Sequence, residues 1–188
     1  MIVGVLVRMY RFVLSEIFEC KLVDSEAYAF LSQFRKFVQW WIDHVEESHK
    51  SYDDLRDSYY SKWREDWSGY NSQHAQTSSL IAHGILKSAK QAPVKKDWGH
   101  SFAVISPSIV KLEERDLLVF PTSLTKKAHI RLIPKTVAQR VLLEQTQNGY
   151  WKLVQILLTD KWCNSPFTRY LDLTAEKKDP IIQELFLK

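Results

Sequence analysis

The stretch Ser101–Pro134, SFAVISPSIVKLEERDLLVFPTSLTKKAHIRLIP, decides the fold of this chain. Its short apolar runs are rich in Val, Ile, Leu and Phe, and each ends at a turn signal, namely Ser106–Ser108, Glu113–Asp116 and Pro121–Ser123. Short apolar runs bounded by turn residues are typical of successive strands. The stretch therefore predicts a small antiparallel sheet or barrel.

Three helices are predicted between an opening strand and this β region. Ile2–Phe18 is β-branched and aromatic, which favours a strand or a strand pair. Asp24 or Ser25 then begins a long amphipathic helix. Two further helices, Asp53–Trp67 and Ser72–Lys90, show the same helical spacing. The apolar stripe of the first helix is Ala27, Phe30, Leu31, Phe34, Phe37, Val38, Trp41 and Val45.

Aromatic side chains recur along these helices, and two interpretations compete for them. Leu55, Tyr59, Trp63 and Trp67 stand four residues apart and form one helix face. Such a seam packs a helical core more often than it stacks on nucleic-acid bases, and we favour the core. The doubled residues at Trp40–Trp41 and Tyr59–Tyr60 are the exception, because Trp40 and Tyr60 cannot share their neighbours' faces.

Strands are also predicted after Pro134. Asn148–Gly149 favours a type I′ hairpin turn between strands at Val137–Gln147 and Tyr150–Thr159. Phe167–Leu173 predicts a further short strand, and Asp179–Pro180 predicts the start of a last short helix.

A lone opening strand cannot form a sheet, so it must pair with the later strands. We therefore expect an α+β fold, a small antiparallel β-barrel with a three-helix bundle inserted after the first strand. The β-barrel domain would comprise residues 1–20 plus 98–175, the helical insertion residues 21–97, and the C-terminal short helix residues 176–188.

Positive charge concentrates in one part of the chain. Lys87–Arg140 holds 11 basic and four acidic residues, whereas residues 24–69 hold six basic and ten acidic residues. Basic residues beside strands suit a phosphate backbone better than a small-molecule pocket. The linker Gln91–His100 is short enough to bring the two basic neighbourhoods together. The candidate phosphate-binding residues are Lys87, Lys90, Lys95, Lys96, Lys126, Lys127, Arg131 and Lys135.

Catalytic and metal-binding motifs are absent from the sequence. It contains no GxSxG, P-loop, GxGxxG or HExxH pattern. His44 and His49 flank two glutamates, but residues five apart lie on different helix faces. Asp53, Asp54 and Asp57 stand at a helix start, where carboxylates complement the dipole. We expect no enzyme activity, no metal and no cofactor.

Cys20 and Cys163 are far apart, which favours a reducing compartment over a disulfide framework. Met1–Val7 is apolar but too short to span a membrane and unlike a signal peptide. The expected location is the cytoplasm, with no membrane partner.

Several pieces of the chain, taken in order, resemble the N-terminal half of the transposon-encoded TnpB (OrfB) proteins, relatives of type V CRISPR effector nucleases. They are Tyr10–Leu14 (YRFVL), the helix around Phe34, Tyr70–Lys90 (YNSQHAQTSSLIAHGILKSAK), Leu117–Phe120, Lys126–Pro134 (KKAHIRLIP) and Gly149–Trp151. The resemblance covers residues 8–159. It implies an OB-like wedge barrel with a helical recognition insertion, which together hold guide RNA and a short DNA motif.

The chain departs from that family in its nuclease half. The GIDxG-type strand with a catalytic Asp and the Cys-rich zinc ribbon do not occur before the sequence ends at Lys188. We therefore expect a protein that binds RNA, DNA or both without cutting them, with any nuclease partner encoded elsewhere. Replacing Lys126, Lys127 and Arg131 by Ala should weaken that binding.

Two other interpretations stay open. One is a protein-interaction or scaffold module that uses the aromatic helical face, and the other is an enzyme without a recognised motif.

Overall fold

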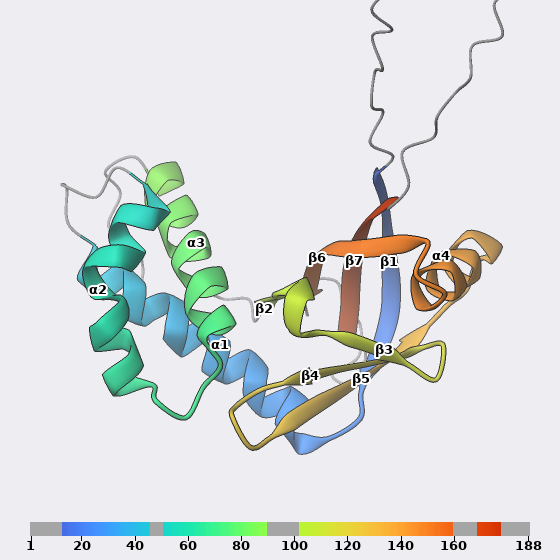
Figure 1. Ribbon diagram of the computed structural model, residues 1–188, viewed down its shortest axis with the longest axis horizontal. Coiled ribbons are helices and arrows are strands. Elements are labelled where there is room, and N and C mark those ends of the chain that lie inside the picture. Colours follow the sequence, from blue (N-terminus) through green and yellow to red (C-terminus); the bar gives the residue numbers. More distant parts are fainter. Residues whose placement is uncertain (1–12, 46–50, 90–101, 160–168, 178–188) are drawn as a thin grey trace, which may run out of the picture.

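A computed structural model describes residues 13–45, 51–89, 102–159 and 169–177 as a mixed α+β fold (Figure 1). Three helices separate the first strand from the later strands, and a fourth helix lies among those strands. In chain order the elements are β1 (Val13–Leu22), α1 (Ser25–His44), α2 (Tyr52–Asp66), α3 (Ser72–Ala89), β2 (Phe102–Ile105), the 3₁₀ turn η1 (Pro107–Ile109), β3 (Lys111–Glu113), β4 (Leu117–Pro121), β5 (Lys127–Ile133), α4 (Val137–Gln147), β6 (Trp151–Thr159) and β7 (Arg169–Lys177).

The strands form one curled antiparallel sheet, a half-barrel with the order β2-β6-β7-β1-β5-β4-β3 (Figure 1). β1 is the central strand and pairs with β7 along one side and with β5 along the other. The prediction that the opening strand joins the later ones is therefore confirmed for Val13–Leu22; residues 1–12 lie outside the described part. The edge strands β2 and β3 are joined directly by η1, so the two sheet edges meet there.

Alternation along the strands separates the core from the outer face. In β5, Ala128, Ile130 and Leu132 are buried, while Lys127 is exposed and Arg131 is partly exposed. Phe18, Cys20 and Leu22 of β1 face the same interior. Because side chains alternate with a period of two, one face of the curled sheet becomes the core and the other carries the charges.

The first two helices begin at side-chain caps. Asp24 accepts a hydrogen bond from the Ala27 backbone N–H (2.8 Å), as the sequence predicted. Ser51 and Asp54 form a reciprocal capping box at the start of α2. In α1 the predicted apolar stripe is buried from Ala27 to Trp41, and α1 runs from beside β5 to α2 and α3 (Figure 1).

The helical aromatic residues form a core. Trp41 and Trp63 are fully buried with their rings stacked, and the Trp41 indole donates a hydrogen bond to Ser78 Oγ (2.9 Å). Trp40 and Tyr60, the expected exceptions, are partly buried and pack against this core, as do Tyr59 and Trp67. The prediction that the aromatic face of α2 packs into the helical core is confirmed.

The turn before α3 and the first turn of α3 are hydrogen-bonded to the end of β4 and to the turn between β4 and β5. The Leu124 N–H donates to the Gly69 carbonyl (2.8 Å), and His74 Nε2 bonds to the Pro121 carbonyl (2.9 Å). A carbonyl only accepts, so Nε2 carries the proton. The His74 ring packs against Phe30 and Phe37.

The prediction of a strand at Val137–Gln147 is wrong, because this segment is the helix α4. Thr136 and Gln139 form a capping box at its start, and Leu142 and Leu143 bury one face. Gly149 has φ of 81°, whereas Asn148 keeps a right-handed helical conformation. A type I′ turn needs positive φ at both residues, so this Asn-Gly pair ends a helix.

Strand β7 overlaps the predicted Phe167–Leu173 strand but begins at Arg169. The predicted C-terminal helix at Asp179 lies outside the described residues. None of the described helices is both long and apolar enough to cross a membrane.

Candidate nucleic-acid interface

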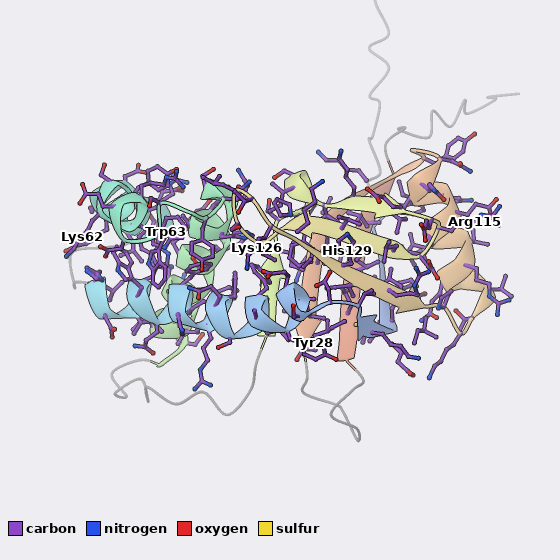
Figure 2. All side chains as sticks on the ribbon, turned by 90° about the horizontal axis from the view of Figure 1, so that it is seen from below. Tyr28, Lys62, Trp63, Arg115, Lys126 and His129 are labelled. Carbon is purple, nitrogen blue, oxygen red and sulfur yellow. The ribbon has the colours of Figure 1, made fainter. Side chains whose placement is uncertain are left out.

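The outer face of β5 and its flanking turns carry four of the predicted phosphate-binding residues. Lys127 and Arg131 alternate with buried residues and point away from the core, as predicted for Arg131. Lys126 precedes the strand and Lys135 follows it. Figure 2 shows Lys126 and His129 along this face, with Arg115 farther along.

Most of these cations are paired with carboxylates. Lys126 Nζ lies 2.7 Å from Glu26 Oε1, and this hydrogen bond raises the pKa of Lys126. Arg131 contacts Glu114 (3.3 Å) and Asp116 (2.8 Å), and the hydrogen bond to Glu114 is the main cause of its raised pKa.

Lys135 forms an ion pair with Glu19. Lys127 is exposed and has no carboxylate partner among the described residues. The paired carboxylates come from β1, α1 and the turn between β3 and β4, so the fold offsets the positive charge that the sequence concentrates here. The outer face of β5 therefore presents little uncommitted positive charge.

Lys87 does not lie near these residues. In α3, His74 bonds to Pro121 at the end of β4, whereas Lys87 is thirteen residues farther along the helix. At a helical rise of 1.5 Å per residue, that separation is about 20 Å. Lys90, Lys95 and Lys96 lie outside the described residues, so their predicted role stays a prediction.

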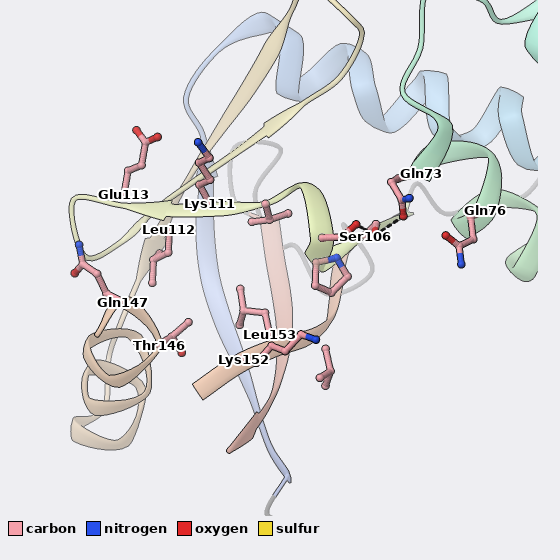
Figure 3. Close-up of a pocket in the computed structure, with 14 residues that line it drawn as sticks. Gln73, Gln76, Ser106, Lys111, Leu112, Glu113, Thr146, Gln147, Lys152 and Leu153 are labelled. Carbon is pink, nitrogen blue, oxygen red and sulfur yellow. Dashed lines mark hydrogen bonds between the residues drawn. The ribbon is translucent and has the colours of Figure 1, made fainter. Parts of the chain in front are cut away.

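A groove where the two edges of the sheet diverge is a second candidate interface. β2 pairs with β6 only over Ile156–Thr159, and β3 pairs with β4. Between β3 and the first half of β6 lies a hollow of about 770 Å³, which we call the seam groove (Figure 3). Its polar lining residues are Gln73, Gln76, Ser106, Ser108, Lys111, Glu113, Thr146, Gln147 and Lys152.

The seam groove combines one lysine, Lys152, with an apolar floor. Leu112 points into it from β3, and Lys152 extends from β6 toward η1, whereas Lys111 and Glu113 leave the other face of β3 (Figure 3). No ion pair joins Lys111 or Lys152 to a carboxylate whose side chain the structure describes; Glu176 of β7, the register partner of Lys152, is not among those side chains. Ser106 Oγ donates to Gln73 Oε1 (3.0 Å), which ties the α3 wall to η1.

A smaller hollow of about 420 Å³, which we call the α2 hollow, lies between α2 and α3. It is lined by Arg56, Asp57, Tyr60, Ser61, Ser72, Gln73 and Gln76. Arg56 is held by Asp53 (3.0 Å) and Asp57 (2.9 Å). Its hydrogen bond to Asp57 raises the pKa of Arg56.

Sequence reasoning missed both hollows. The only local signal was Pro107, which interrupts an otherwise strand-like run and lacks the N–H needed to continue the pairing of β2. Nothing in the sequence showed that the two sides of this break become opposite edges of one sheet.

No protein-family model matches this chain, and no curated protein sequence matches it. Within residues 13–45, 51–89, 102–159 and 169–177, no group of three or more His, Cys, Asp or Glu side chains is arranged to hold a metal ion.

Proposed function

We propose that this is a non-catalytic nucleic-acid-binding protein that holds RNA or an RNA–DNA complex in the seam groove. In this proposal the half-barrel is an OB-like wedge, and α1–α3 are an insertion into it. The order of strand, three helices and strands supports the likeness to the N-terminal part of TnpB-type proteins.

The observation that carries the proposal is the contrast in charge pairing. On the outer face of β5, Lys126, Arg131 and Lys135 are bound to carboxylates. At the seam groove, Lys111 and Lys152 form no ion pair with any carboxylate whose side chain the structure describes, Glu113 of the lining included. A cation already paired with a carboxylate gains less from a phosphate, because the phosphate must displace its partner. Phosphates are therefore expected at the seam groove.

The alternative of a protein-interaction module that uses the aromatic helical face has less support. Trp41 and Trp63 are buried in the helical core, and Trp40 stacks on His44 and donates to Asp66 (2.8 Å). These rings are committed to internal contacts, so they do not form an exposed aromatic surface.

The test is fluorescence anisotropy with labelled RNA and DNA across a salt series. The double variant Lys111→Ala/Lys152→Ala should lower affinity and flatten the log–log salt dependence by about 0.7–0.9 for each phosphate that the protein no longer neutralises. Lys36→Ala/Lys62→Ala is the matched control, because both lysines are exposed on helices away from the groove.

A parent protein that binds neither RNA nor DNA would refute the proposal. An equal decrease in affinity in the two double variants would mean that the seam groove has no special role. Incubation of the parent with Mg²⁺ or Mn²⁺ should leave the bound nucleic acid intact.

A further inference from the structure

The seam groove and the α2 hollow meet at the start of α3. Gln73 and Gln76 line both hollows, so one path leads from α2, across the first turns of α3, to η1 and β6. We call this path the α3 crossing. It joins a helical part and a sheet part that are separate in the sequence.

The two glutamines on the crossing have amide groups available to a ligand. Gln73 Oε1 accepts a hydrogen bond from Ser106, and no partner within the described residues occupies its amide N–H₂. Gln76 is exposed, and its side chain makes no hydrogen bond to any other described residue. A side-chain amide presents a donor beside an acceptor, which matches the edge of an unpaired base.

The charges differ between the two ends of the crossing. Lys152 supplies positive charge at the seam end, where Lys111 and Glu113 also line the groove but leave the face of β3 opposite Leu112 (Figure 3). At the α2 end, Arg56 is paired with both Asp53 and Asp57, which leaves a net negative charge there, and the ring of Tyr60 is partly exposed. The seam end thus suits a phosphate, and the α2 end suits a base.

We propose that the α3 crossing binds one extended single strand of nucleic acid, with a phosphate beside Lys152, base edges at Gln73 and Gln76, and a base against Tyr60. This inference rests on the proposed function and specifies its ligand. A duplex hides its base edges and presents its phosphates over a broad surface. A duplex would therefore need a broad cationic surface, and the ion pairs on the outer face of β5 neutralise most of the positive charge there.

The first test compares a single strand with a duplex of the same sequence, in RNA and in DNA, by anisotropy. The single strand should bind at least about tenfold more tightly than the duplex. Preference for RNA over DNA would show that the 2′-hydroxyl contributes, and equal affinity would show that phosphates and bases suffice. Both results support the crossing.

Matched charge substitutions locate the strand. Ser61→Glu and Gln76→Glu put a carboxylate on the crossing, and each should weaken binding by about threefold or more through repulsion of phosphates. Ser58→Glu on the same helix and Gln155→Glu on β6 add the same charge at exposed positions outside both hollows, and should leave binding unchanged. Circular dichroism verifies that all four variants fold.

Photocrosslinking of an oligonucleotide with a photoreactive base checks continuity. Crosslinks should appear in the peptide with Tyr60 and in the peptide with Lys152, and affinity should rise with strand length and then level off.

If Lys111→Ala/Lys152→Ala weakens binding while Ser61→Glu and Gln76→Glu do not, the proposed function stands and the crossing is refuted. Equal or tighter binding of the duplex also refutes the crossing, and failure of every nucleic acid to bind refutes the proposed function itself. Displacement of the bound strand by an unrelated acidic peptide at similar concentration would overturn the crossing in favour of a peptide ligand.

Discussion

The outer face of β5 and the seam groove both carry lysines, but they use them differently. On β5, Lys126 and Arg131 lie 2.7–3.3 Å from carboxylates of α1 and of the β3–β4 turn. At the seam groove, no ion pair joins Lys111 or Lys152 to a carboxylate whose side chain the structure describes, although Glu113 lines the same groove. The density of basic residues along a sequence therefore does not give the charge available to a ligand. That quantity depends on which acidic side chains the fold brings beside them.

The two regions also differ in how they are held. The β5 face belongs to a continuous ladder between β1 and β4. The seam groove has a helical wall, α3, whose first turn is fixed to the sheet by His74 and Gln73. Disturbing that attachment should alter the groove while leaving the β5 face in place.

The largest expected effect is acid destabilisation through His74. Its side chain is fully buried, its Nδ1 has no hydrogen-bond partner within the described residues, and burial lowers its pKa from 6.5 to about 4. The unfolded state binds this proton more readily, so the free energy of unfolding should fall as the pH drops from 6.5 to about 4. The total decrease is about 3 kcal/mol.

Urea denaturation at several pH values measures this decrease. Carboxylates also titrate at low pH, so the comparison uses His74→Gln, which keeps an N–H donor but cannot be protonated in this range. The parent should lose more stability than the variant between pH 6.5 and 4. Parallel curves for the two proteins would show that His74 does not couple α3 to the sheet through its protonation.

The next effect is charge reversal in the seam groove. Lys152→Glu should weaken single-strand binding at 0.1 M salt by about tenfold, or about 1.4 kcal/mol, because an attraction to phosphate becomes a repulsion. Lys36→Glu makes the same reversal on α1 and should change affinity by less than about twofold. Anisotropy titrations of both variants, at matched thermal stability, decide whether the effect is local to the groove.

The smallest effect is expected on the β5 face. Lys126→Ala/Lys127→Ala/Arg131→Ala should weaken binding by less than about threefold at 0.15 M salt, because two of the three cations are already paired. The measurement is the same titration, beside Lys111→Ala/Lys152→Ala. Should the triple variant bind more weakly than the groove variant, the assignment of the two regions would be reversed, and the β5 face would be the interface.

The sequence by itself determined most elements of this fold. The stripe of α1, the Asp24 cap and the alternation of β5 were predicted because each depends on neighbours within a few residues. The pairing of β1 with later strands followed because a lone strand has nowhere else to place its backbone hydrogen bonds. The wrong prediction at α4 also came from local signals. The Asn-Gly pair favours a hairpin, whereas the capping box of Thr136 and Gln139 favours the helix that forms.

Only the tertiary structure decided which charges are neutralised and where the sheet opens. Lys126 and Glu26 are 100 residues apart in sequence, yet they form an ion pair. The seam groove arises because β2 and β3, joined by η1, become opposite edges of one curled sheet. Contacts between distant segments depend on the path of the whole chain, and no local pattern of residues encodes that path.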